Sequence, residues 1–257
     1  MALREWDKID TFTEEFPTYN CAFLDILGYK QRAVEFFDQR FNLYGRINRA
    51  LNTVAIAQAL TAPLLDISAI TVEIISDSII ILQPARAMGL ATILSFACHF
   101  ASTLSFEGLF LRGGIAQGRH CRRKTEQGFE FLASEAFQKA YLLECEKAIN
   151  PRVLIDADLI GSIISEVKPL ILREGSDYIL DFAHHVINRE GKNSKSVHAE
   201  MTDIQSEIKR QTSDKTRSQL QWVLDYYYWT ISQNPKWDAP AFAAFKSDED
   251  RHFARLE

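Results

Sequence analysis

Two aspartates, Asp25 and Asp77, interrupt strongly apolar stretches of the chain, CAFLDILGYK at 21–30 and EIISDSIII at 73–81. A carboxylate at the end of a buried strand costs free energy unless a cation lies against it. If neighbouring strands bring both carboxylates together, a divalent cation offsets their repulsion, and hard oxygen ligands favour Mg²⁺ or Mn²⁺ over zinc. The pattern predicts a metal site, with the alternative that Asp25 caps a helix and Asp77 starts a turn.

Gly28, three residues after Asp25, adds an anion-binding feature. A glycine lets the backbone approach a ligand closely, and the free N–H groups of a following helix attract an anion. A divalent cation beside a bound phosphate is the chemistry that these residues support together.

The apolar pattern predicts the elements that position these residues. In chain order they are strand 22–27, helix 32–60 closed by Pro63, strand 67–75, strand 78–84 after a tight corner at Ser76-Asp77, helix 85–104 and strand 108–118. The order β-α-β-β-α-β is the ferredoxin-like arrangement, with two helices on one face of an antiparallel sheet. We therefore expect an α+β fold whose first and third strands are central neighbours.

The rest of the chain predicts additional strands and C-terminal helices around this core. The expected elements are polar loop 119–128, helix 131–149, strand 151–156, helix 158–167, strands 168–174 and 176–183, and one or two amphipathic helices from about Ser194. We expect three parts: an N-terminal arm (1–19), a core (20–185) and a helical extension packed on it (186–257).

Composition narrows the class of protein. The net charge is -5 without a dominant basic block, which argues against a dedicated nucleic-acid binder. Four scattered cysteines form no CxxC pair, so a disulfide framework or a zinc site is not expected. The N-terminus is too polar for a signal peptide, and we expect no membrane span and a cytoplasmic location.

Three segments, AFLDILGYK, IISDSIII and LRGGIAQG, have the order and spacing of motifs in class III nucleotide cyclases. The ISDS and RGGIA variants, with EAFQKAYLLE, NPRVLID and QWVLDYYY, resemble the pyrimidine cyclases of the bacterial Pycsar anti-phage system. The resemblance runs from about Ala22 to Trp229. It implies an enzyme that converts UTP, or CTP, to the 3′,5′-cyclic monophosphate and pyrophosphate, with a separate effector that responds to the product. The alternatives are a guanylate-type purine cyclase and a cyclase-like protein that binds nucleotide without catalysis.

The resemblance also implies roles for the residues of the first two motifs. Asp25 and Asp77 would be ligands of two metal ions, Mg²⁺ or Mn²⁺, with the Ile26 carbonyl assisting. One ion would lower the pKa of the ribose 3′-hydroxyl and the other would hold the triphosphate. The amides expected to cradle phosphate are those of Leu27, Gly28 and Tyr29.

Class III cyclases form head-to-tail homodimers in which one subunit supplies the aspartates and the other reads the base. Glu73 stands at the base-reading position, where a carboxylate accepts from uracil N3–H or a cytosine amine. Its alternative is an exposed or Arg-paired glutamate. If Glu73 and Asp77 lie on one strand, they are roughly 13 Å apart and point to the same face. Thr71 points to that face too and is a further base-contact candidate.

Two further positions carry open alternatives. Arg112, in the third motif, either contacts phosphate or forms a buried salt bridge. On the late helix, purine cyclases have Asn and Arg four residues apart, where this chain has Gln138 and Leu142. Gln138 can still hydrogen-bond to a nucleotide, but Leu142 supplies no charge, which argues against an ordinary adenylate cyclase.

Overall fold

The structure is a computed structural model that describes residues 15–61, 67–124, 126–184, 187, 194–249 and 251–256. Pro63, predicted to close a helix, and most of the predicted N-terminal arm lie outside this range. The strands are β1 Thr18–Ile26, β2 Thr71–Ile75, β3 Ser78–Pro84, β4 Leu111–Lys124, β5 Glu130–Ser134, β6 Val153–Ile155, β7 Ile171–Glu174, β8 Asp177–Leu180 and β9 Phe253–Arg255. The helices are α1 Tyr29–Phe37, α2 Leu43–Thr61, α3 Gly89–Phe106, α4 Glu135–Lys147, α5 Phe182–His184, α6 Ser194–Arg210 and α7 Asp214–Ser232.

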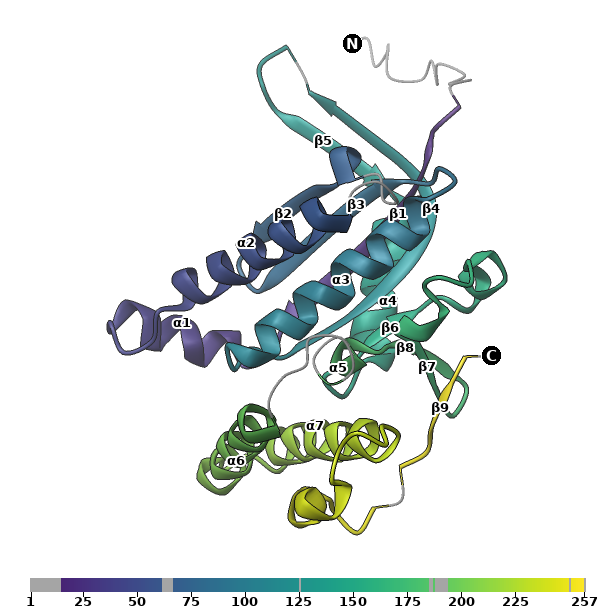
Figure 1. Cartoon of the computed structure of the whole chain (residues 1–257). Coiled ribbons are helices and arrows are strands. Elements are labelled where there is room, and N and C mark those ends of the chain that lie inside the picture. Colours follow the sequence, from purple (N-terminus) through teal and green to yellow (C-terminus); the bar gives the residue numbers. More distant parts are fainter. Residues whose placement is uncertain are drawn as a thin grey trace.

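The described strands form one sheet in the order β2-β3-β1-β4-β6-β8-β7-β9, with β5 paired to β4 (Figure 1). β1 lies between β3 and β4 and is antiparallel to both. This confirms the predicted α+β, ferredoxin-like core, including the central pairing of the first and third strands.

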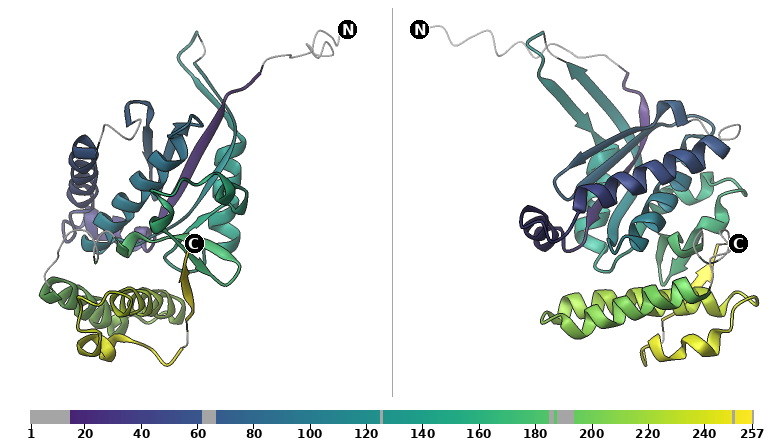
Figure 2. Two further views of the ribbon diagram at one scale, coloured as in Figure 1. Left: turned by 45° about the vertical axis from the view of Figure 1, so that its right-hand side comes forward. Right: turned by 60° about the vertical axis from the view of Figure 1, so that its left-hand side comes forward.

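Helices cover both faces of the central strands (Figure 2). Along β1, Ala22, Leu24 and Ile26 pack into the main core with α2 and α3, because side chains alternate across a strand. Cys21 and Phe23 point the other way, where α4 closes a smaller core. The two helices expected on one face are therefore confirmed, and α4 adds a layer on the opposite face.

α3 is the most deeply buried of these helices. Among the described residues it is the one helix long and apolar enough to cross a membrane by length and composition, and 83% of it is buried inside the fold. The core helix of a globular fold passes the same test, and α3 is such a core helix, because most of its residues are buried.

The helix predicted at 32–60 is two helices. α1 ends at Phe37, and α2 starts after Asn42, whose side-chain Oδ1 accepts a hydrogen bond from the Gly45 amide at 2.8 Å. Asparagine is among the preferred residues at this capping position. The apolar spacing continues across the break, although α1 has no buried residue and its Val34 and Phe37 are exposed.

The prediction of a polar loop after Gly118 is also wrong. β4 continues to Lys124 and pairs with β5, forming an arm that projects from the body (Figure 1). Exposed residues occupy both faces of most of this arm, so the alternation that marks a half-buried strand is missing. α4 consequently starts at Glu135 rather than at 131, and Ser134 Oγ caps it by accepting from the Phe137 amide.

The C-terminal part completes the main core. Trp222 and Tyr226 of α7 are fully buried in it, and β9 adds a strand beside β7. β9 was not predicted, since three residues near a chain end carry little pattern. The helix predicted at 158–167 is a short 3₁₀ turn, Ala157–Ser162.

Glycines in β4 bring α4 close to the sheet. A Cβ on Gly114 would lie 2.3 Å from the Ala140 carbonyl oxygen, which leaves no room for a methyl group. Gly114→Ala should therefore lower the free energy of unfolding by about 2–3 kcal/mol, measured by urea denaturation.

Gly161→Ala is the matched control for this substitution, because no atom lies within 4 Å of its added Cβ. We expect a change within about 0.5 kcal/mol there. Equal effects of the two substitutions would show that the close packing of α4 on β4 does not hold.

Candidate active site

Strand register places Asp25 at the end of β1, opposite Ser78 of β3 and Arg112 of β4. The β2–β3 hairpin turns through Ser76 and Asp77, and Ser76 has a left-handed φ of 60°. The Asp77 carbonyl accepts a hydrogen bond from the Ile26 amide at 3.0 Å. The hairpin turn therefore lies against the end of β1, and the two predicted carboxylates come to one corner of the sheet.

Arg112 lies against the Asp25 carboxylate. Its Nε donates to Asp25 Oδ2 at 2.8 Å and lies 2.7 Å from Glu144 Oε1 of α4. Of the two alternatives for Arg112, the structure shows the salt bridge. Glu144 was not predicted as a site residue, although its spacing after Ala136 and Ala140 marks the buried stripe of α4.

The charges in this corner do not balance. Burial raises the pKa of Asp25; Arg112 opposes this rise and the Asp77 carboxylate adds to it. Burial likewise raises the pKa of Glu144, with Arg112 opposing and both aspartates adding. Two carboxylates thus contact one guanidinium, and the Asp77 carboxylate lies near enough to act on both of them. When all three acids are ionised, an excess of two negative charges remains.

The backbone after Asp25 forms part of the predicted phosphate cradle. Gly28 has φ 70° and precedes α1, and its carbonyl accepts from the Gln31 amide. The Leu27 amide instead donates to the Phe110 carbonyl at 2.9 Å, so this amide does not face a phosphate as predicted. The Tyr29 and Lys30 amides precede this bond at the start of α1, and amides at such positions are left without an acceptor inside the helix.

Glu73 lies on edge strand β2, where its carboxylate pairs with Arg122 of the arm, and Arg122 also pairs with Glu130. The Arg-paired alternative for Glu73 is therefore the one observed. Asp77 lies in the turn beyond the end of β2, so the estimate that placed it and Glu73 on one strand and one face was wrong.

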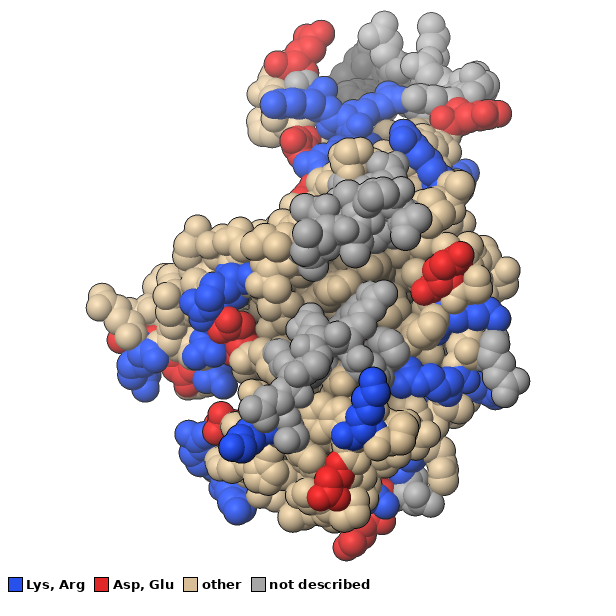
Figure 3. All heavy atoms as spheres, in the orientation of Figure 1, with Lys and Arg blue, Asp and Glu red and all other residues tan. Residues whose placement is uncertain are grey.

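Basic and acidic side chains gather on the arm (Figure 3). Arg119 pairs with Glu135, and Arg122 pairs with two glutamates. Their charges are thus largely compensated within the chain.

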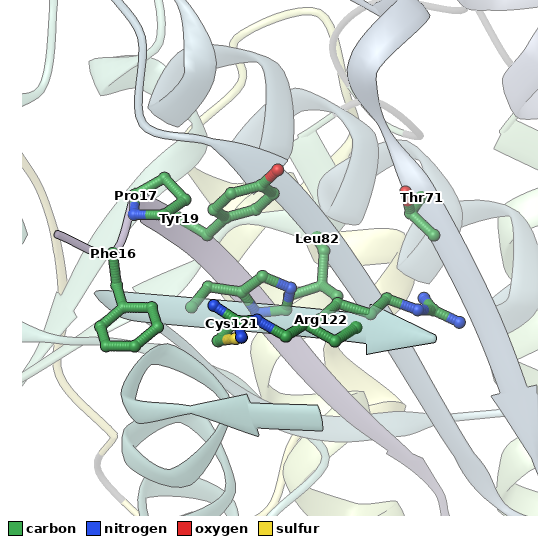
Figure 4. Close-up of a pocket in the computed structure, with 9 residues that line it drawn as sticks. Phe16, Pro17, Tyr19, Thr71, Leu82, Cys121 and Arg122 are labelled. Atoms are coloured by element: carbon green, nitrogen blue, oxygen red, sulfur yellow. The ribbon is translucent and has the colours of Figure 1, made fainter. Parts of the chain in front are cut away.

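Thr71 lines a cavity of about 250 Å³ at the opposite end of β1 (Figure 4). Tyr19, His120 and Arg122 also contribute to its wall. Strand pairing puts Thr71 level with Cys21, four residues or roughly 13 Å along β1 from Asp25. Glu73 is level with Phe23, two residues from Asp25, but its carboxylate is turned to Arg122 of the arm. Both base-contact candidates therefore lie on β2, two strands away from Asp25.

Gln138 is not brought to the aspartates. It is exposed on α4, as is Leu142, whereas Ala136, Ala140 and Glu144 form the buried face. The structure therefore places Glu144, rather than Gln138, beside Arg112.

No protein-family model and no curated protein matches the chain. Among solved structures, the adenylyl cyclase CyaB from P. aeruginosa is 12% identical, covering 65% of this chain and 94% of that one, with a TM-score of 0.43. The guanylate cyclase domain of RhGC from Catenaria anguillulae is 13% identical over 65% and 94%, with a TM-score of 0.41. The adenylate cyclases from Trypanosoma brucei are 12% identical over 73% and 96%, with a TM-score of 0.46.

The corner fits a divalent cation that also binds a phosphate ligand. The described residues contain no group of three or more His, Cys, Asp or Glu that could hold a metal by themselves. Mg²⁺ commonly uses one or two protein carboxylates and takes its other ligands from water and substrate phosphates. Asp25 and Asp77, with the excess negative charge around them, meet that requirement, and the Ile26 carbonyl is the predicted assisting ligand.

Proposed function

We propose that this protein is a nucleotidyl cyclase acting on a pyrimidine nucleoside triphosphate, UTP in preference to CTP. The observation that carries the proposal is the convergence of Asp25 and Asp77 beside the N-terminus of α1, with negative charge left uncompensated. In the proposed reaction the ribose 3′-hydroxyl loses its proton to water and its oxygen bonds to the α-phosphorus. The bond from that phosphorus to the bridging oxygen breaks, and pyrophosphate leaves.

Each part of the corner has a role in this reaction. Asp25 and Asp77 would hold two Mg²⁺ or Mn²⁺ ions, which when bound acidify the 3′-hydroxyl and neutralise triphosphate charge. The Tyr29 and Lys30 amides at the start of α1 would orient the phosphates. Arg112, one quarter exposed, can direct its remaining N–H groups at phosphate oxygens.

The choice of base rests on the motif resemblance. Glu73 and Arg122 together offer an acceptor and donors, a combination that each of the four bases can satisfy. The ISDS and RGGIA variants are what favour a pyrimidine over guanine.

A homodimer with shared active sites accounts for the distance between the base-contact candidates and the aspartates. Strand pairing puts Thr71 level with Cys21, four residues along β1 from Asp25 and two strands away from it. In a head-to-tail pair, each site would combine the aspartates of one copy with Thr71 and Glu73 of the other. The cyclic product would act as a second messenger in anti-phage defence on a separate effector protein.

Incubating the protein with each nucleoside triphosphate and Mn²⁺, then resolving products by mass spectrometry, tests the proposal. We expect a cyclic pyrimidine monophosphate and pyrophosphate, both lost when EDTA removes the metal. Cyclic GMP alone would replace this function with a purine cyclase. Tight nucleotide binding without product in any reaction would identify a binding protein.

A further inference from the structure

Arg112 has one Nε–H but two carboxylates beside it. The Asp25 oxygen at 2.8 Å accepts this hydrogen, whereas Glu144 Oε1, at 2.7 Å, is buried without a hydrogen bond. A buried carboxylate oxygen left without a donor costs free energy. The arrangement with Arg112 on Asp25 therefore satisfies one acid at the expense of the other.

The two acids differ in how firmly they are held. The Glu144 side chain is 5% exposed, and α4 is fixed against β4 through Gly114 and Gly118. The Asp25 side chain is 15% exposed and faces the corner where Asp77 also lies. A cation arriving at that corner can reach Asp25, whereas Glu144 stays behind the guanidinium.

We propose that Glu144 is a positioning residue that takes over the Arg112 guanidinium when Asp25 binds a divalent cation, an inference that rests on the proposed function. Asp25 gives up its hydrogen bond from Arg112 Nε, and Glu144 Oε1, already within bonding distance, receives it. Arg112 thus keeps one ion-pair partner and remains beside the triphosphate site. Without this acceptor, cation binding would break the Asp25–Arg112 ion pair and leave the guanidinium without a carboxylate beside it.

Glu144→Asp separates this role from a simple effect of charge. The aspartate keeps the negative charge but withdraws the carboxylate by one methylene, out of reach of Arg112. We expect Glu144→Asp and Glu144→Gln each to weaken Mn²⁺ binding about tenfold, measured on the full chain without nucleotide by electron paramagnetic resonance of free Mn²⁺. In an Arg112→Gln background, Glu144→Asp should change the affinity less than about twofold.

Glu135→Asp and Glu135→Gln are matched controls, because Glu135 lies on the same helix but pairs with exposed Arg119. They should bind Mn²⁺ as the unaltered protein does, and thermal unfolding should verify that all variants are folded. If Glu144→Asp fails to fold, Glu144→Gln is measured with and without Arg112→Gln, because the transfer requires Arg112 whereas a simple effect of charge does not.

The outcomes separate this inference from the proposed function. Normal Mn²⁺ affinity in Glu144→Asp, with weakened affinity in Glu144→Gln, would overturn the transfer of Arg112 and leave charge alone as the explanation. Normal affinity in both variants would also overturn it, while cyclic nucleotide production would keep the proposed function intact. An unaltered protein that binds no Mn²⁺ and makes no cyclic product would remove both.

Discussion

Replacing Asp77 by Ala is expected to reduce cyclic nucleotide formation by roughly 10³-fold or more, because loss of a metal ligand removes several kcal/mol of transition-state stabilisation. The fold should survive. The hydrogen bond that ties the turn to β1 uses the Asp77 backbone carbonyl, and the left-handed φ belongs to Ser76, so an alanine at 77 meets no strain. The turnover rate with Mn²⁺ and UTP gives the measurement, with circular dichroism as the check on folding.

Asp203→Ala is the control for this substitution, since Asp203 is an exposed aspartate on α6, far along the chain from the site. Its activity should equal that of the unaltered protein. If Asp77→Ala also retains normal activity, the assignment of Asp77 as a metal ligand is wrong.

The second large effect is expected at the C-terminal strand. Arg255 of β9 donates to the Asp181 carboxylate at 2.5 Å, and the Asp181 side chain is completely buried. Tyr226 of α7 also donates to this carboxylate. Arg255→Ala removes the guanidinium from a buried charge, and we expect the free energy of unfolding in urea to fall by about 3 kcal/mol.

Arg210→Ala provides the comparison, because Arg210 is 71% exposed and pairs with Glu207 at the surface of α6. Exposed pairs of this kind contribute at most about 1 kcal/mol. A similarly small effect at Arg255 would mean that β9 and its ion pair do not help to hold the C-terminal part on the core.

The central sheet could be predicted from the sequence because its strands carry strong local patterns. β1 and β3 are near-continuous apolar runs, and the hairpin corner at Ser76-Asp77 separates two such runs. The β-α-β-β-α-β order then fixes which strands are neighbours. The meeting of Asp25 and Asp77 follows from that order alone.

The contacts across the site could not be predicted in the same way. Glu144 reaches Arg112 because glycines of β4 let α4 pack closely on the sheet. This is a tertiary contact, which the local sequence pattern does not predict. The pairing of Glu73 with Arg122 depends on the arm, whose exposed strands resemble a polar loop in sequence. The two carboxylates that carry the proposed chemistry were therefore predictable, and their ionic partners were not.

A crystal grown with Mn²⁺ and a non-cyclisable UTP analogue tests the metal site most directly, because manganese scatters anomalously. The account predicts anomalous peaks between the carboxylates of Asp25 and Asp77, at roughly the 2.1 Å typical of Mg²⁺ ligands, with the triphosphate completing the coordination. Nucleotide bound elsewhere, or an Asp25 still paired with Arg112 and no manganese at the corner, would contradict it.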